Sequence, residues 1–268
     1  MRRPGTLSSV HALFVPVRAL LGSLVPCAAC GRRPAGVHGA CGTCRARFED
    51  LGAGGAEPAG PERVEVAWSG PYDGPYRRAV RALKYGARRD VARPLGRSLA
   101  ARVRAEGWPV ARVAHVPLHP GRRIRRGYDQ AELLARRVAA ELGAPFRPTL
   151  RRVRPTRRQA RLEGRARQAN VDGAFRSAPV PPVPVLLVDD VLTTGATTSA
   201  CAAALRAAGA RSVRIAVACR ARPAADVRWI VPAWADEPPR SRAGTTVDQN
   251  ENAVAVRTPK SAPANTCG

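Results

Sequence analysis

Hydrophobic positions in the central part of the chain follow two alternating spacings. Short runs of apolar and β-branched residues have the length of buried strands, and longer segments repeat apolar residues at helical intervals. Strands that alternate with helices of this length predict an α/β fold, with helices packed on a parallel sheet. The predicted strands cover residues 64–68, 113–116, 185–188 and 212–219, and the predicted helices cover residues 77–85, 91–104, 130–142 and 196–208.

The first 25 residues contain a stretch that could be mistaken for a signal peptide. Arg2 and Arg3 precede an apolar run, but Pro16 and Arg18 interrupt it. Apolar residues between positions 13 and 24 instead follow helical spacing, so we predict a short amphipathic helix there. No stretch reaches the roughly 20 uncharged apolar residues of a transmembrane helix. We therefore expect a cytoplasmic protein without a transmembrane segment.

Changes in composition divide the chain into four segments. One short segment is rich in Gly, Ala and Pro, which indicates a linker or a long loop. The last segment lacks apolar periodicity, which predicts disorder. The segments are residues 1–52 with the N-terminal helix and a cysteine-rich module, 53–62 as a linker, 63–234 as the α/β domain, and 235–268 as a disordered tail.

The 268-residue chain is strongly basic, with 45 basic against 20 acidic residues and a net charge of +25. Only Lys84 and Lys260 are lysines, and such a preference for Arg is expected of a GC-rich genome. That bias explains Arg in place of Lys, but it does not explain the excess of basic over acidic residues. The excess predicts attraction to polyanions such as nucleic acid, phosphorylated metabolites or a membrane surface.

Four of the seven cysteines form two CxxC pairs. Each pair can form a tight turn that directs both sulfur atoms to one point. Two such turns facing each other make the tetrahedral thiolate cage of a structural Zn²⁺ site, and the metal replaces a core that so few residues cannot build. Disulfides and an iron–sulfur cluster are the alternatives, and a cytosolic chain makes disulfides less favourable. The predicted zinc ligands are Cys27, Cys30, Cys41 and Cys44.

The segment VLLVDDVLTTGATT, residues 185–198, carries the clearest chemical signal in the chain. A buried strand ends in two carboxylates, and a Thr/Gly loop then opens a helix whose free N–H groups can bind phosphate. The carboxylates would repel phosphate, so they suit a sugar diol or a bound Mg²⁺. A capped helix after a buried strand is the plainer alternative, but capping alone needs fewer polar residues than this segment contains. The predicted ribose-phosphate site consists of Asp189, Asp190, Thr193, Thr194, Gly195 and Thr197.

This run resembles the phosphoribosyl-pyrophosphate motif of type I phosphoribosyltransferases. Together with further motifs, it makes roughly residues 10–220 similar to the ComF family, phosphoribosyltransferase-like proteins associated with DNA uptake in competent bacteria. The family usually has Phe-Asn where this chain has Tyr128 and Asp129, so no role is carried over to Asp129. The further motifs are the four cysteines, ALKYG at 82–86, HVPLHP at 115–120, GYDQAEL at 127–133 and GAF at 173–175.

The resemblance implies a type I phosphoribosyltransferase-like domain that binds phosphoribosyl pyrophosphate or a nucleotide together with Mg²⁺. It also implies a structural Zn²⁺, single-stranded DNA as a further ligand, and other DNA-uptake proteins as partners. An active phosphoribosyltransferase of nucleotide salvage is the alternative. Residues 220–234 show no recognisable base-recognition hood, which favours the DNA-handling protein. Catalysis in this fold is mostly electrostatic, however, so the absence of a general base leaves enzymatic activity open.

Arginines concentrate in two segments, 121–126 and 147–167. By resemblance, the first belongs to a loop that binds pyrophosphate, and the second lies in or near a basic hood over the substrate. Arg forks match phosphate oxygens, but the same density of charge suits a single-stranded DNA backbone, and a solvated surface is the plain alternative. The residues predicted to contact pyrophosphate or nucleic acid are Lys84, Arg122, Arg123, Arg125, Arg126, Arg157 and Arg158.

Overall fold

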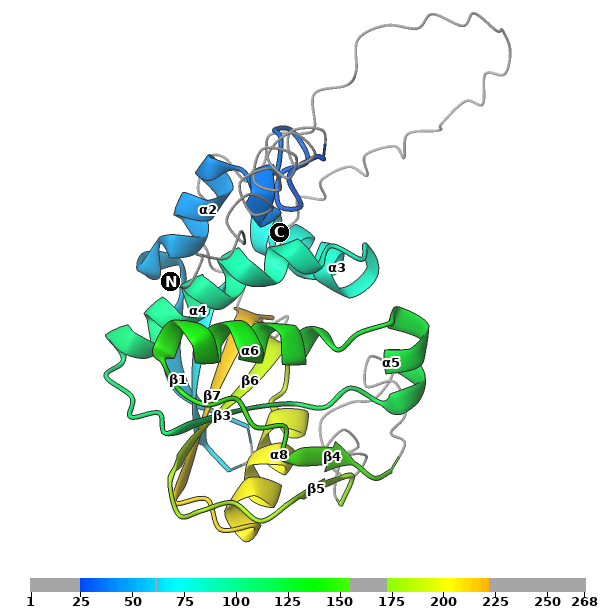
Figure 1. Cartoon of the computed structure of the whole chain (residues 1–268). Coiled ribbons are helices and arrows are strands. Elements are labelled where there is room, and N and C mark those ends of the chain that lie inside the picture. Colours follow the sequence, from blue (N-terminus) through cyan, green and yellow to red (C-terminus); the bar gives the residue numbers. More distant parts are fainter. Residues whose placement is uncertain (1–24, 61, 155–172, 222–268) are drawn as a thin grey trace, which may run out of the picture. The chain divides into compact units, whose positions relative to one another are not determined.

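The computed structural model of the protein describes residues 25–60, 62–154 and 173–221 (Figure 1). Several sequence predictions fall on the remaining residues. The N-terminal helix, the tail 235–268, and the basic residues Arg157 and Arg158 lie outside the described residues.

Five strands form the central sheet, in the spatial order β1-β2-β7-β6-β3. Four of them run parallel to one another, and β1 at one edge is antiparallel to β2. The predicted α/β fold with a parallel sheet is therefore confirmed. The strands are β1 Gly55–Ala59, β2 Val64–Pro71, β3 Arg112–His115, β6 Pro184–Leu192 and β7 Ser212–Arg220, and a separate antiparallel pair consists of β4 Leu150–Arg152 and β5 Phe175–Ser177.

Helices cover both faces of the sheet (Figure 1). α3, α4 and α6 share one hydrophobic core with the sheet, and α8 shares a second core with its other face. In the part of the chain that the structure describes, no helix combines the length and the apolar composition needed to cross a membrane. The helices are α2 Gly42–Glu49, α3 Gly74–Tyr85, α4 Ala92–Ala105, α5 Pro120–Arg126, α6 Gln130–Leu142 and α8 Ala196–Ala207, with short 3-10 turns at Gly36–His38, Leu51–Ala53 and Arg89–Val91.

Alternate residues of β6 belong to the two cores. Leu186 packs in the core of α3, α4 and α6, whereas Leu187 packs in the core of α8. Successive side chains of a strand point to opposite faces, and this alternation continues into the carboxylates that follow. It directs Asp190 toward α3 and α6, and Asp189 toward the face of α8. The two acids are therefore neighbours in the chain with different surroundings.

Most predicted elements occur at the expected places, and β2, β6 and β7 are longer than predicted. α6 has the predicted bounds, and Gly209, with φ +109°, is the C′ residue of α8, the position where a glycine commonly ends a helix. β6 does not end at residue 188 but continues to Leu192, because β7 runs beside it and pairs Leu192 with Arg220. The two carboxylates consequently lie within the strand and not after it. The sequence patterns did not indicate α2, α5 or the β4–β5 pair.

Residues 53–62 are not the linker that their composition predicts. They contain β1, which pairs with β2 from Gly55 opposite Trp68 to Ala59 opposite Val64. Pro58 lies in this strand, and proline is tolerated in a strand at the edge of a sheet, where one side needs no ladder of hydrogen bonds. A low content of apolar residues is thus compatible with a strand at this position.

The cysteine module packs directly on the α/β domain. Phe48 of α2 is 1% exposed and belongs to the same core as α3 and α4. The hydroxyl of Ser98 donates a hydrogen bond to the carbonyl of Phe48. Tyr76 donates to the carbonyl oxygens of Ser69, at 3.0 Å, and Arg47, at 3.2 Å. The boundary predicted at residue 52 therefore does not separate two cores, and the described residues belong to one compact unit.

Candidate functional site

A cavity of about 250 Å³ opens where β6 leads into α8. Its walls come from that junction, the C-terminal end of α3, the loop after β3, α5 and β4. In α/β proteins with parallel sheets, ligands bind at this carboxyl edge of the strands. The polar residues that line the cavity are Lys84, Arg122, Arg126, Gln130, Arg152, Asp189, Asp190, Thr193, Gly195, Thr197 and Thr198.

The junction between β6 and α8 presents backbone N–H groups to the cavity. Gly195 is the N-cap of α8, with φ +78°, and no side chain of the described residues caps the helix. The first N–H groups of a helix have no partner within it and carry the positive end of its dipole, a combination that binds phosphate. A Cβ atom at Gly195 would lie 2.9 Å from Cα of Gly60. Both the backbone angle and the packing therefore require glycine.

Asp190 is held by residues from two other elements. Its Oδ1 lies 2.6 Å from Nζ of Lys84 in α3, and its Oδ2 accepts a hydrogen bond of 2.6 Å from Nε2 of Gln130 in α6. The carboxylate is buried. Burial lowers the pKa of Lys84, but the charge of Asp190 and its hydrogen bond outweigh burial and raise that pKa, so Lys84 keeps its charge. Asp190 thus positions a cation at the edge of the cavity.

Asp189 is the freer of the two carboxylates. Its Oδ1 accepts a hydrogen bond of 2.7 Å from the backbone N–H of Asp190. Burial raises the pKa of Asp189 well above its ordinary value, and the adjacent charge of Asp190 raises it further. A carboxylate that is costly to ionise gains from a ligand that donates hydrogen bonds to it, as a sugar hydroxyl does.

Four cations line the cavity, from three elements. Lys84 comes from α3, Arg122 and Arg126 from α5, and Arg152 from β4. Burial lowers the pKa of Arg152, and the nearby charge of Arg122 lowers it further, although an arginine stays charged at neutral pH. Such a density of positive charge fits a ligand that carries several phosphate charges.

The predicted site residues separate into those that the structure brings together and those that it does not. Thr194 belongs to the phosphate loop but is absent from the cavity lining. Arg125 lines a neighbouring cavity. Arg123 points elsewhere, because its guanidinium pairs with Glu132 at 3.1 Å. The residues brought together are Lys84, Arg122, Arg126, Asp189, Asp190, Thr193, Gly195 and Thr197.

Two members of the site, Gln130 and Arg152, were not predicted from the sequence. Gln130 reaches Asp190 across 60 positions of the chain, a contact that depends on how α6 packs on the sheet. Arg152 lies in the short strand β4, which has no recognisable strand pattern. Its position in an arginine-rich segment is the one sequence feature that could have indicated a role for Arg152 in the site.

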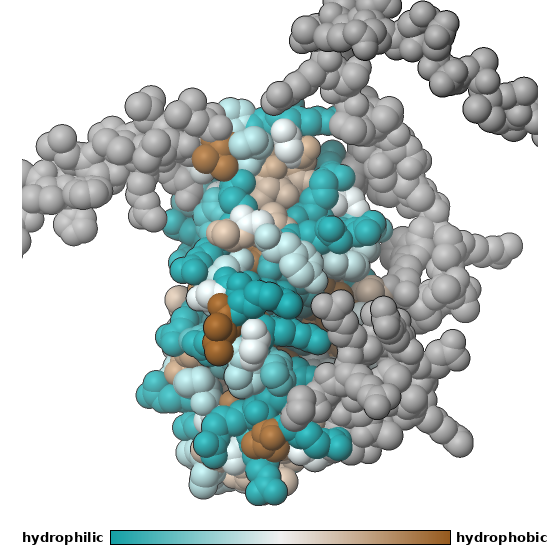
Figure 2. Space-filling model, turned by 90° about the vertical axis from the view of Figure 1, so that its right-hand side faces the viewer, coloured by the Kyte–Doolittle hydropathy of each residue, from teal (hydrophilic) through white to brown (hydrophobic). Residues whose placement is uncertain are grey.

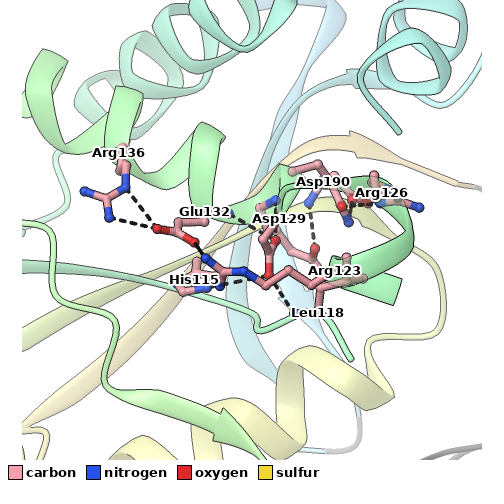
Figure 3. Close-up of polar contacts among 11 residues, drawn as sticks. His115, Leu118, Arg123, Arg126, Asp129, Glu132, Arg136 and Asp190 are labelled. Atoms are coloured by element: carbon pink, nitrogen blue, oxygen red, sulfur yellow. Dashed lines mark hydrogen bonds and ion pairs between the residues drawn. The ribbon is translucent and has the colours of Figure 1, made fainter. Parts of the chain in front are cut away.

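Asp129 supports the wall of the cavity from behind (Figure 3). As N-cap of α6, its Oδ1 accepts hydrogen bonds from the N–H groups of Ala131, at 3.0 Å, and Glu132, at 3.3 Å. Its Oδ2 accepts from the N–H of Leu118 at 2.7 Å, and the Nε2 of buried His115 lies 3.7 Å from the same oxygen. Leu118 lines the cavity, so Asp129 fixes the loop after β3. This structural role explains why a carboxylate fits where the family usually has Asn.

The four cysteines of the two CxxC pairs converge as predicted. Their sulfur atoms all lie within 4.8 Å of one another, and the Sγ atoms of Cys30 and Cys41 are 3.9 Å apart. Four sulfurs at about 2.3 Å from a tetrahedral Zn²⁺ are separated by about 3.8 Å, whereas a disulfide needs about 2.05 Å. The described cysteines are free, and these four can bind a metal such as zinc.

Backbone groups prepare one of these thiols for metal binding. Burial raises the pKa of Cys27, but backbone N–H groups, among them that of Cys41 at 3.2 Å from its Sγ, outweigh burial and bring the pKa down to about 7. Burial raises the pKa of Cys41 and of Cys44. A cation would favour the thiolate form at all of these positions.

Comparison with known proteins identifies a family and several relatives of this chain. The family described as phosphoribosyl transferase domain matches residues 129–234. The chain is 34% identical over 227 residues to DNA utilization protein YhgH of Salmonella typhi, covering 82% of this chain and 94% of that protein. It is 31% identical over 201 residues to the Escherichia coli K12 protein of the same name, covering 72% and 83%. Competence protein F of Haemophilus influenzae is 36% identical over 105 residues, covering 37% of this chain and 46% of that protein.

Among solved structures, the chain is similar to adenine phosphoribosyl transferase from Trypanosoma brucei. The TM-score is 0.33 and the identity 16%, with 77% of this chain and 88% of that chain covered, which is too distant a likeness to bear on the site.

Fold, cavity and family match together define a phosphoribosyltransferase-like protein with a mostly parallel sheet. Within that class, the identity to DNA utilization protein YhgH extends over nearly the whole length of the relative. The chain belongs to the ComF family, which has Competence protein F among its members.

Proposed function

We propose that the chain binds phosphoribosyl pyrophosphate or a nucleoside monophosphate in the cavity at the end of β6. The 5′-phosphate lies on the N–H groups of residues 193–197, and the ribose hydroxyls donate hydrogen bonds to the carboxylates of Asp189 and Asp190. The observation that carries the proposal is the presence in one cavity of a free helix N-terminus, two carboxylates and four cations. The helix N-terminus, the carboxylates and the cations would each contact a different part of the same ligand.

The residues of this cavity can bind Mg²⁺ only together with phosphate groups of the ligand. Both oxygens of Asp190 are engaged, by Lys84 and by Gln130, and one oxygen of Asp189 accepts the N–H of Asp190. Among the described residues of the cavity, Asp189 therefore offers the one carboxylate oxygen without a protein partner, and Mg²⁺ commonly binds through one or two carboxylates plus substrate phosphates; a ribose hydroxyl can still donate to an oxygen of Asp190 that already has one partner. When bound, the ion would neutralise the charge of the pyrophosphate, while Lys84 and the arginines orient it.

We further propose that the protein handles single-stranded DNA in the cytoplasm as part of DNA uptake, together with other DNA-uptake proteins, and that its four-cysteine cluster holds Zn²⁺. The names of its relatives, DNA utilization protein and Competence protein F, support the first part. The excess of 45 basic over 20 acidic residues supports binding to a polyanion.

Transfer of the ribose phosphate to an acceptor base is a second candidate function. Lys84, Arg122 and Arg152 in the cavity favour it, because these cations could stabilise a departing pyrophosphate. A pyrophosphate-release assay with phosphoribosyl pyrophosphate and a panel of bases distinguishes the two functions. Release with one of the bases would establish an enzyme, and binding without release would establish a binding protein.

Calorimetry tests the proposed ligand. Wild-type protein should bind phosphoribosyl pyrophosphate with Mg²⁺, and the D189N/D190N double variant should bind it about tenfold more weakly or worse, because two charged acceptors are lost. Inorganic phosphate should bind both proteins alike, since the N–H groups of the loop remain. The matched control D73N removes an exposed carboxylate at the N-cap of α3 and should leave binding unchanged. Equal affinity of the wild type and the double variant would overturn the assignment.

A further inference from the structure

A second cavity, of about 300 Å³, adjoins the proposed ribose-phosphate site. The two cavities have four lining residues in common: Lys84, Tyr85, Arg122 and Arg126. Arg125 and Tyr128 line only the second one. Among the described residues, no acidic side chain lines the second cavity, which therefore combines four cations with two aromatic rings and suits an anion that also has a flat face.

Tyr85 is the exposed aromatic ring of this cavity. It is the last residue of α3 and 72% exposed. The guanidinium carbon of Arg126 lies 5.3 Å from the centre of its ring, and that of Arg81 lies 5.8 Å from it. An exposed ring that is surrounded by arginines is the arrangement on which proteins stack the bases of single strands, because every base has a π-face.

Tyr128 has a different role in the same cavity. It is 7% exposed, and its hydroxyl donates a hydrogen bond to the carbonyl of Leu83. The guanidinium of Arg89 lies over its ring, 4.6 Å from the centre. A ring that is buried and anchored in this way forms the floor of the cavity. Tyr85 is thus the ring that can stack on a ligand.

The arginines of α5 differ in their availability. Arg123 is occupied by Glu132. Within the described part of the chain, the side chains of Arg122 and Arg125 have neither a hydrogen-bond partner nor a carboxylate within ion-pair distance, and only their backbone groups are bonded, within α5 and its N-terminal turn. The side of the molecule on which α5 lies in Figure 1 faces the reader in Figure 2, and hydrophilic residues predominate there. Phosphates of a strand can therefore reach these cations from solvent.

The two cavities call for different ligands. Asp189 and Asp190 suit free ribose hydroxyls, but an internal nucleotide of DNA has no 2′-hydroxyl and its 3′-oxygen is esterified. The second cavity requires only a base face and phosphate charge, which every nucleotide of a strand offers. The cations shared by both cavities, Lys84, Arg122 and Arg126, cannot neutralise a pyrophosphate and a strand phosphate at the same time.

We propose that the second cavity binds a nucleobase and its flanking phosphate in single-stranded nucleic acid, with Tyr85 as the stacking surface, and that this binding excludes phosphoribosyl pyrophosphate. The inference rests on the proposed function, because it assumes that the first cavity takes phosphoribosyl pyrophosphate. Linkage makes the exclusion reciprocal, so each ligand weakens the other by the same factor. The level of phosphoribosyl pyrophosphate would then control access of the strand to this face.

Fluorescence anisotropy with a labelled oligo-dT strand tests both parts. Saturating phosphoribosyl pyrophosphate with Mg²⁺ should raise the Kd for the strand about tenfold or more, in comparison with a sample matched in ionic strength and Mg²⁺. The variant Y85A should raise the Kd about 5- to 150-fold, which corresponds to the ~1–3 kcal/mol typical of base stacking on one aromatic ring. Y85F keeps the ring and should bind as the wild type does.

The outcomes separate this inference from the proposed function. If calorimetry shows phosphoribosyl pyrophosphate bound while the Kd for the strand stays the same, mutual exclusion is refuted and the first site stands. If Y85A and Y85F bind the strand equally well, the stacking surface is refuted. If phosphoribosyl pyrophosphate does not bind at all, the proposed function itself fails. Absence of strand binding at low salt refutes the second cavity as a nucleic-acid site.

Discussion

Replacing Asp189 by Asn should stabilise the unliganded protein and weaken its ligand binding. The carboxylate lies beside Asp190 in a buried strand, and burial followed by the charge of Asp190 raises its pKa. Asn keeps an oxygen at the position of Oδ1, which accepts the N–H of Asp190 at 2.7 Å, so this hydrogen bond survives. The substitution removes mainly a charge that the folded state accommodates poorly.

At neutral pH the unfolding free energy of the variant should exceed that of the wild type by about 0.5–2 kcal/mol. This is the usual gain when a residue that serves function at the expense of stability is replaced. For a chain of this length, that corresponds to a rise in Tm of about 1–8 °C. The pKa of Asp189 in the folded protein lies above the ordinary value of about 3.9, so the folded state retains a proton that the unfolded chain has released. The unfolding free energy of the wild type therefore falls as pH rises from about 4 through the folded pKa. The unfolding free energy of D189N does not fall in this way, so the difference in stability between the variant and the wild type grows with pH.

Urea denaturation at several pH values between 5 and 8 measures this difference. D73N serves as the control, because Asp73 is an exposed N-cap residue and Asn caps a helix equally well. That control should stay within about 0.5 kcal/mol of the wild type at every pH. An Asp189→Asn variant that is less stable than the wild type at pH 7, or whose advantage is constant with pH, would refute the reasoning.

Three further predictions concern the cysteine module, the N-cap of α6 and the phosphate loop. Cys41→Ser should reduce bound zinc from about one per chain by elemental analysis and lower the Tm of the whole protein, since the module shares a core with α3 and α4; a wild type without zinc would contradict the assignment. Asp129→Ala should cost about 2–4 kcal/mol in urea denaturation, because the N–H groups of Leu118, Ala131 and Glu132 lose their acceptors. D129N should cost less, because its amide oxygen can still cap α6, although its NH2 group cannot accept the N–H of Leu118; equal losses would contradict the capping role. Gly195→Ala should cost about 1–2 kcal/mol from its positive φ alone and abolish phosphate binding by calorimetry, and unchanged phosphate affinity would rule out the loop.

The sequence predicted the elements whose signals are local. α6 begins and ends where its apolar spacing predicts, and the four cysteines meet as their CxxC spacing requires. Local patterns also located the phosphate loop, because its strand, its Thr and Gly residues and the start of its helix follow one another directly in the chain. These predictions needed no knowledge of which elements are neighbours in space.

The features that the sequence did not predict depend on packing between distant segments. β1 has the composition of a loop and is a strand because it lies beside β2 at the edge of the sheet. The different partners of Asp189 and Asp190 follow from strand alternation, and the partners themselves, Lys84 and Gln130, come from two other helices. Arg123 differs from its neighbours in α5 because Glu132 of α6 lies within reach. None of these contacts has a local signature.

A crystal structure of the protein with phosphoribosyl pyrophosphate and Mg²⁺ tests the central claim most directly. We expect the 5′-phosphate to lie on the N–H groups of residues 193–197, a ribose hydroxyl to donate to Asp189, and the pyrophosphate to face Lys84, Arg122 and Arg152. Electron density for the ligand elsewhere on the protein, or a 5′-phosphate on the arginines of α5 in place of the loop, would contradict the proposed site.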